Sequence, residues 1–351
     1  MRLPSLAATL VLVVLPTTAS AAETTLDWSV ADRLSSPASV QKEAPARPLA
    51  LHVVLTGPCP SAPRWTLDGK PVQAVERSGC AFDLPLGTTG RHDLEVETGS
   101  GDPLREQVDL RDLHVVSLGD SVASGEGNPD GLGPRWLERR CHRSLRSGAA
   151  QAVLAAERGD RRSVVTFVPL GCSGATIDEG LLGPYAGIQP DRRRGRLPPQ
   201  ADVLDALVAR RPVDAVLLSV GANDVFFGPL LRFCRGVENC EERRFDPAHP
   251  GREAADPQAP TAAAAVDAAL ADLSGNYDEL AKRLHRVVAA DDVVIVEYFD
   301  PLRDQDGELC RAALPGVSRD EAAWAERAVL QPLNEQVRAA ASRHGWRLVS
   351  G

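Results

Sequence analysis

Two patterns of hydrophobic and polar positions divide the chain near residue 111. From residue 25 to 111, short runs alternate apolar and polar residues and are broken by turn residues such as Asp68-Gly69. These runs lie at residues 49–55, 65–67, 80–84, 92–96 and 107–110. Alternation with a period of two, interrupted by turns, is typical of a small antiparallel β-sandwich. Residues 22–111 are therefore predicted to form an immunoglobulin-like all-β domain, either a structural appendage or a carbohydrate-binding or substrate-positioning module.

Behind this region, apolar runs alternate with longer segments that have helical periodicity. Strands are predicted at residues 115–118, 164–168, 215–220, 293–298 and 346–349, and helices at 147–158, 201–210, 262–290 and 319–344, the last kinked or split at Pro332. Strands that alternate with helices indicate a parallel sheet covered by helices. Residues 112–351 are therefore predicted to form an α/β domain.

A Pro-rich, charged segment between Phe233 and Pro260 has no periodicity. A loop of this length in a compact domain is usually functional or variable. We interpret it as a surface insertion, either one that shapes substrate entry or a plain variable loop.

The first 21 residues have the pattern of a signal peptide. Arg2 precedes an apolar run from Leu6 to Leu15, and Ala19-Ser20-Ala21 matches a signal peptidase site. The run is too short to span a bilayer, and no later run of about 18 apolar residues follows it. We expect a secreted protein whose mature chain begins near Ala22, with no integral membrane segment.

Composition and net charge argue against a nucleic-acid partner and do not indicate a particular acyl or sugar substrate. The chain has 351 residues, of which 43% are hydrophobic and 25% charged, enough for a sizeable core and two domains. A net charge of -9 gives no basic field for a phosphate backbone, so we expect no nucleic-acid partner. Aromatic residues make up 4% and form no stripe that would indicate acyl or sugar binding. The sequence does not reveal the oligomeric state, and a monomer is the working expectation.

The chain has seven cysteines, an odd number. Export would make them disulfide partners. Proximity in the sequence indicates the pairs Cys59–Cys80, Cys141–Cys172 and Cys234–Cys240, which leaves Cys310 without a mate in this chain. Connectivity cannot be deduced from sequence, so other pairings stay open.

Three predicted strands end in the same way, in glycine followed by small polar residues. The ends are residues 119–121, 171–174 and 221–224. In an open parallel sheet the carboxyl ends of the strands lie along one edge, where ligands bind. That edge would hold the hydroxyl of Ser121, the amide of Gly174 and the carboxamide of Asn223. Ester hydrolysis needs this set, because serine attack creates an oxyanion that preorganised donors must meet. Each turn alone is compatible with an ordinary connection between a strand and a helix. Three such turns in series favour the catalytic interpretation.

The blocks LGDSVASGEGN, GCSGAT and SVGAND, in this order, resemble the first three sequence blocks of the SGNH, or GDSL-type, hydrolases. The resemblance covers residues 113–351 and implies a flavodoxin-like, three-layer α/β/α hydrolase that needs neither metal nor cofactor. It implies that Ser121 is the nucleophile and first oxyanion donor, Gly174 the glycine donor and Asn223 the asparagine donor. CHRS at 141–144, PPQ at 198–200 and EYFDP at 297–301 also resemble secreted bacterial members.

The sequence departs from this family at its last block, an Asp-x-x-His that supplies the general base, because the C-terminal region contains none. We expect none of the seven histidines to reach Ser121; they are His52, His92, His114, His142, His249, His285 and His344. The chain stops just after the strand predicted at 346–349, so we hypothesise a C-terminally incomplete gene product. In secreted relatives a cysteine near the catalytic histidine pairs with the region of Cys310, which agrees with this hypothesis.

The resulting prediction is a secreted serine ester hydrolase, an esterase or lipase, that acts on a small-molecule, lipid or glycan ester through an acyl-enzyme. The chain itself is expected to be weakly active at best without the histidine block. The alternatives are a carbohydrate deacetylase and a non-catalytic binding protein with a degenerate hydrolase domain.

Overall fold

The computed structural model describes residues 24–30, 49–99, 102–131, 133, 135–191, 193–301, 303, 306–308 and 316–350. The predicted signal peptide and Cys310 lie outside the described residues. No helix in the described part of the chain is long and apolar enough to cross a membrane. Contacts divide the chain into two compact units, one built mainly from residues 50–85 and 92–108 and the other mainly from 109–351.

The first unit consists of short antiparallel strands, as its alternating pattern predicts. They are β1 (Thr25–Val30), β2 (Leu49–Thr56), β3 (Arg64–Leu67), β4 (Lys70–Val72), β5 (Val75–Glu76), β6 (Ala81–Leu86) and β7 (Gly90–Glu97). One sheet has the order β1-β2-β6-β5, and in the other β3 pairs antiparallel with β4 and β7. Trp65 of β3 and Phe82 of β6 are in contact, with ring centroids 5.2 Å apart, and join the two sheets.

The second unit is organised around a parallel sheet. Its strands are β8 (Leu104–Gly119), β9 (Ser163–Pro169), β10 (Ala215–Ser219), β11 (Val293–Val296) and β12 (Arg347–Val349). The spatial order is β9-β8-β10-β11-β12, and every neighbouring pair is parallel. This is the flavodoxin-like order 2-1-3-4-5, in which ligands bind beyond the carboxyl ends of the strands where the order reverses, here between β8 and β10. The expected α/β fold class is confirmed.

Strand β8 is much longer than its predicted core. It begins at Leu104 and follows β7 in the sheet order before it pairs with β9 and β10. The segment that was predicted as a separate strand at 107–110 is part of β8, because its alternating residues continue directly into the buried run. The boundary proposed between residues 111 and 112 thus falls inside one strand.

Helices fill the connections between the strands. They are α1 (Ser121–Ser124), α2 (Gly148–Gly159), α3 (Gln200–Val208), α4 (Phe227–Cys234), α5 (Ala262–Leu284), α6 (Arg319–Trp324), the π-helical segment η4 (Ala325–Leu330) and α7 (Gln331–His344), with 3-10 turns η2 (Cys240–Glu242) and η3 (Ala290–Asp292). The helix predicted at 262–290 ends earlier, at Leu284. The helix predicted at 319–344 is divided, with Pro332 in the first turn of α7, where a missing N–H is tolerated.

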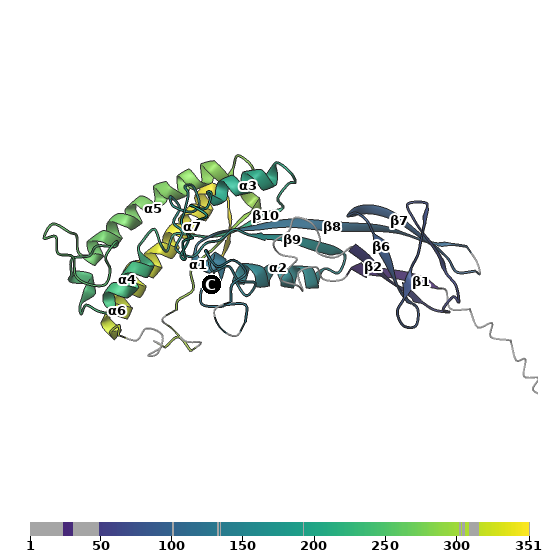
Figure 1. Cartoon of the computed structure of the whole chain (residues 1–351), viewed down its shortest axis with the longest axis horizontal. Helices are drawn as coiled ribbons and strands as arrows, with labels where there is room; N and C mark the ends of the chain where they lie inside the picture. Colours follow the sequence, from purple (N-terminus) through teal and green to yellow (C-terminus); the bar gives the residue numbers. More distant parts are fainter. Residues whose placement is uncertain are drawn as a thin grey trace, which may run out of the picture. The chain divides into compact units, whose positions relative to one another are not determined.

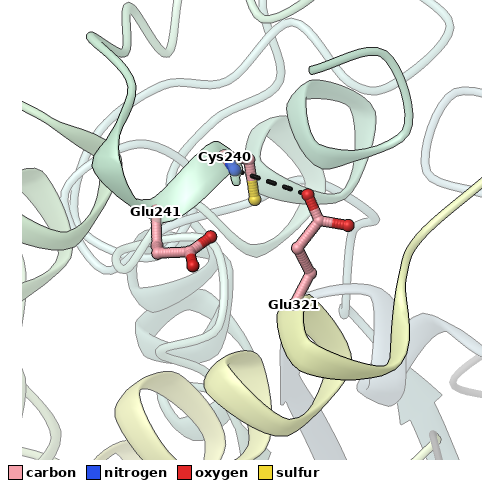
Figure 2. Close-up of side chains that lie close together, drawn as sticks. All are labelled: Cys240, Glu241 and Glu321. Atoms are coloured by element: carbon pink, nitrogen blue, oxygen red, sulfur yellow. Dashed lines mark hydrogen bonds between the residues drawn. The ribbon is translucent and has the colours of Figure 1, made fainter. Parts of the chain in front are cut away.

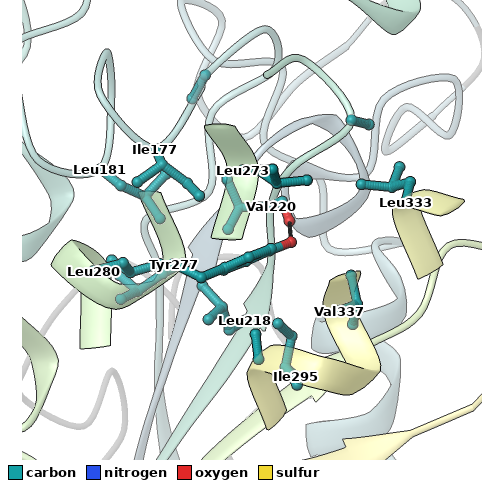
Figure 3. Packing of buried hydrophobic residues seen from close by; sticks show 14 of the residues in the cluster. Ile177, Leu181, Leu218, Val220, Leu273, Tyr277, Leu280, Ile295, Leu333 and Val337 are labelled. Atoms are coloured by element: carbon teal, nitrogen blue, oxygen red, sulfur yellow. Dashed lines mark hydrogen bonds between the residues drawn. The ribbon is translucent and has the colours of Figure 1, made fainter. Parts of the chain in front are cut away.

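Helices cover both faces of the parallel sheet (Figure 1). On one face Val116 and Leu118 of β8 join a large cluster with residues of α3, α5 and α7. On the other face Val115 packs with Phe167 of β9 and with residues of α2. Alternate residues of a strand thus face opposite helix layers. Figure 3 shows Tyr277 of α5 in the larger cluster among residues of β10, β11 and α7.

The three disulfides expected from proximity are present: Cys59–Cys80, Cys141–Cys172 and Cys234–Cys240. This part of the prediction is confirmed.

Candidate active site

The turn that carries Ser121 follows directly from β8. Gly119, the last residue of β8, has φ +133°, and a Cβ at this position would lie 1.9 Å from the Ser219 carbonyl oxygen of β10. Only glycine fits such an approach. The next residue, Asp120, caps α1 by accepting a hydrogen bond from the Val122 amide at 3.0 Å. Ser121 therefore begins α1 at the carboxyl end of the sheet.

The glycine loop after β9 is attached to the same edge. The Cys172 amide donates to the Gly119 carbonyl oxygen at 2.9 Å, so this loop contacts the end of β8. Gly174 has φ +83°, and a Cβ there would lie 2.4 Å from the Tyr185 hydroxyl oxygen. That hydroxyl donates to the Ser173 carbonyl oxygen at 3.2 Å. The Gly174 backbone is thus fixed by neighbours on both sides.

Asn223 follows β10 and reaches the glycine loop. Its Nδ2 donates to the Ala175 carbonyl oxygen at 2.9 Å. A carboxamide has two N–H donors, so one remains for another acceptor. Asp224, the next residue, accepts a hydrogen bond from the Ile177 amide at 3.1 Å, and burial raises its pKa to about 6.

The three turns singled out in the sequence are therefore joined by hydrogen bonds at one edge of the sheet. The catalytic roles of Ser121, Gly174 and Asn223 stay predictions.

Sequence reasoning assigned no role to Tyr298, which lies just after β11. Its hydroxyl donates to Asp120 Oδ2 at 2.5 Å and accepts from the Ala222 amide at 3.1 Å. Burial raises the pKa of Tyr298 well above its usual value, so this hydroxyl is a donor toward Asp120. Asp120 is fully buried, and burial raises its pKa to about 7 against the opposing effect of the Tyr298 hydrogen bond. The available signals were the position of Tyr298 at the end of a predicted strand and its place in the EYFDP segment at 297–301.

His142 is connected to the nucleophile segment through a carboxylate. Its Nδ1 lies 2.8 Å from Glu126 Oε2, and the Glu126 amide donates to the Ser121 carbonyl oxygen. The imidazole stacks on Trp136, with ring centroids 4.5 Å apart, and Nε2 is buried without a hydrogen-bond partner among the described residues. In the described part of the chain no hydrogen bond joins any histidine to the Ser121 hydroxyl.

The long loop after α4 also carries a histidine–carboxylate pair. His249 Nδ1 lies 2.8 Å from Asp246 Oδ2, and the His249 side chain is 74% exposed. Both residues line a cavity of about 910 Å³ that also includes Asn223. Asp246 and His249 have the Asp-x-x-His spacing, but they lie in the long loop and not in the C-terminal region where this block was expected.

The cavity beside Asn223 is lined by both polar and apolar residues. Six of its lining residues are acidic: Asp178, Asp224, Asp246, Glu253, Asp256 and Asp272. Arg252, Gln258 and Asn276 add donors, and Phe226 and Phe245 supply apolar surface. The long loop forms much of this wall, so the structure places it near one of the candidate residues.

Among the described residues, one group has side chains close enough to hold a metal ion: Cys240, Glu241 and Glu321 (Figure 2). Its chemistry does not fit a cation. The Cys240 sulfur is bonded to Cys234, and the Glu321 carboxylate accepts from the amides of Cys240 and Ser318. These contacts attach the disulfide loop to α6.

Solved structures with a similar fold come from several bacteria. An extracellular lipase from Streptomyces rimosus is 20% identical, with 68% of this chain and 80% of that chain covered and a TM-score of 0.41. A putative arylesterase from Agrobacterium tumefaciens is 18% identical, with 68% and 83% covered and a TM-score of 0.32. An active-site mutant of a family two carbohydrate esterase from Clostridium thermocellum is 12% identical, with 94% and 88% covered and a TM-score of 0.30.

A comparison with curated proteins found no match. The family model of the GDSL-like lipases and acylhydrolases matches residues 117–350, which is more than half of the chain and includes all three turns. The chain therefore belongs to the GDSL-like Lipase/Acylhydrolase family.

Proposed function

We propose that this protein is a secreted serine ester hydrolase in which Ser121 attacks the ester carbonyl and forms an acyl-enzyme that water then hydrolyses. The observation that carries the proposal is the set of hydrogen bonds that joins the Ser121 turn to the loops of Gly174 and Asn223. Family membership supports the same chemistry. Three disulfides within the described residues support an oxidising compartment.

The oxyanion that forms during attack would accept hydrogen bonds from three donors. These are the amides of Ser121 and Gly174 and the second N–H of the Asn223 carboxamide. Loss of one such donor in other enzymes costs about 2.7–4 kcal/mol of transition-state stabilisation. The attack also needs a base for the Ser121 proton. Because no described histidine is hydrogen-bonded to Ser121, we expect the 351-residue chain to be weakly active.

Hydrolysis of p-nitrophenyl acetate at high protein concentration tests the proposal. We expect Ser121→Ala to reduce the rate to the buffer background. Ser124→Ala is the matched control, because Ser124 lies in the same short helix and its hydroxyl donates to the Ser121 carbonyl oxygen instead of facing a substrate. Equal rates in the wild type and Ser121→Ala would refute the assignment of Ser121. Labelling by a serine-directed phosphonate that is slow but lost in Ser121→Ala would favour an enzyme over a degenerate binding protein.

A carbohydrate deacetylase is the second candidate within this class, because the carboxylates, amides and Arg252 of the cavity beside Asn223 suit the hydroxyl groups of a sugar ester. Rates with an acetylated sugar, p-nitrophenyl acetate and p-nitrophenyl palmitate separate deacetylase, short-chain esterase and lipase.

A further inference from the structure

The chain has three tyrosines, and each hydroxyl makes a hydrogen bond at one of the turns of the candidate site. The Tyr185 hydroxyl donates to the Ser173 carbonyl oxygen, and the Tyr277 hydroxyl donates to the Val220 carbonyl oxygen at 2.6 Å. Each of these two contacts a single turn. Tyr298 differs, because its hydroxyl contacts two turns at once.

The Tyr298 hydroxyl lies between the residues that directly precede the nucleophile and the asparagine donor. It donates to the carboxylate of Asp120, the neighbour of Ser121, and accepts from the amide of Ala222, the neighbour of Asn223. The proton and an acceptor lone pair of this one oxygen are thus both used. From this geometry we propose that Tyr298 is a positioning residue that fixes the Ser121 turn relative to the Asn223 turn. The inference rests on the proposed function.

Tyr298 is itself held in place, as a positioning residue must be. Its backbone amide donates to Asn334 Oδ1 of α7 at 2.9 Å, and Asn334 Nδ2 donates to its carbonyl oxygen at 2.9 Å. Its side chain is buried, with 8% of the residue exposed. If one of the two turns moved, the Tyr298 hydroxyl could therefore not keep both of its hydrogen bonds.

The hydrogen bonds of the Tyr298 hydroxyl to Asp120 and Ala222 should affect the transition state more than substrate binding. The oxyanion exists only after attack and must lie within hydrogen-bond reach of both the Ser121 amide and the Asn223 carboxamide. A misplacement of about 1 Å can cost about 10²-fold in rate. An error in the spacing of the two turns should therefore lower kcat and leave KM nearly unchanged.

Tyr298→Phe tests the inference, because it removes the hydroxyl and keeps the ring. We expect kcat for p-nitrophenyl acetate to fall by about 10- to 100-fold with KM within about twofold of the wild-type value. Tyr277→Phe is the matched control, since it also removes a buried tyrosine hydroxyl of the same region but one bonded to a single turn. We expect its kcat to stay within about threefold. Thermal unfolding of both variants reports any general loss of stability.

The inference is overturned if Tyr298→Phe keeps kcat within threefold, or if Tyr277→Phe loses as much as Tyr298→Phe. If Tyr298→Phe does not fold, Asp120→Ala replaces it, because that change removes the acceptor of the Tyr298 hydroxyl and keeps the tyrosine. An unchanged kcat then refutes the positioning role of Tyr298. If the wild type has no Ser121-dependent hydrolysis, the proposed function fails, an outcome distinct from an active wild type that tolerates Tyr298→Phe.

Discussion

The Gln200 side chain pairs with the backbone of Gly119 through two hydrogen bonds. Its Oε1 accepts from the Gly119 amide at 2.8 Å, and its Nε2 donates to the Gly119 carbonyl oxygen at 2.9 Å. Gln200 is the first residue of α3 and is only 4% exposed. The first residue of α3 thus forms hydrogen bonds with both backbone polar groups of Gly119, which lies two positions before Ser121.

Gln200→Ala should lower the free energy of unfolding by about 2 kcal/mol, because it leaves the buried Gly119 amide without its acceptor. Urea denaturation measures this change. Gln189→Ala is the control, since Gln189 is exposed and its side chain accepts a hydrogen bond from the side chain of Arg139. Its effect should stay within about 0.5 kcal/mol. Equal losses in the two variants would contradict a structural role for the Gln200 pair.

Asn223→Ala should lower kcat by about 10²- to 10³-fold with little change in KM, because it removes one oxyanion donor. Steady-state hydrolysis of p-nitrophenyl acetate gives both constants. Asn276→Ala is the control for p-nitrophenyl acetate, because Asn276 lines the same cavity but is not one of the three predicted donors to the oxyanion. If the Asn223 variant raised KM alone, Asn223 would be a residue for substrate binding rather than for the transition state.

Asp120 should make the fold less stable as the pH rises. Its folded pKa of about 7 lies above the usual value of 3.8, so the stability contributed by its neutral form is present below about pH 4 and is lost as the pH rises through about 7. The groups that face it are Asp224, whose charge adds to the increase, Tyr298, whose hydrogen bond opposes it, and buried Tyr277.

Asp120→Asn should remove the part of the pH dependence that comes from Asp120, which is of the order of 4 kcal/mol for a shift of this size, and leave the smaller part that comes from Asp224, whose pKa burial raises to about 6. Denaturation at pH 4.5 and pH 7.5 should show a larger loss in the wild type than in Asp120→Asn. Asp256→Asn, at an exposed position, controls for the removal of one charge. The same pH dependence in wild type and Asp120→Asn would rule out Asp120 as its source.

His142 and His249 each pair with a carboxylate, but neither is hydrogen-bonded to Ser121. We therefore expect His142→Ala and His249→Ala to change the rate of phosphonate labelling by less than about threefold, whereas loss of a general base typically costs about 10²- to 10⁴-fold. A loss of that larger size in one variant would identify that histidine as the base.

The candidate site residues at the strand ends could be predicted from the sequence. The residues that hold these turns in place from distant parts of the chain could not. Ser121, Gly174 and Asn223 stand out because glycine and small polar residues at strand ends are a local pattern. Tyr298 and Gln200 bond to residues 178 and 81 positions away. The segments EYFDP and PPQ that contain them stand out in the sequence, but nothing in these segments indicates which residues they contact.

The exact ends of helices and strands could not be predicted from the sequence pattern either. The helix predicted to continue to residue 290 ends at Leu284, and a turn follows in which the Val287 amide donates to the Leu284 carbonyl oxygen three residues before it. Likewise β11 ends at Val296, two residues before its predicted end, because the Tyr298 backbone bonds to the Asn334 side chain instead of a neighbouring strand.

The acidic residues of the cavity beside Asn223 would also affect the release of the product. Ester hydrolysis releases a carboxylic acid, which is an anion at neutral pH. A cavity with six acidic residues repels an anion and disfavours its return. In an ester hydrolase this charge would hasten product departure, and the accumulating acid would compete poorly with fresh neutral ester.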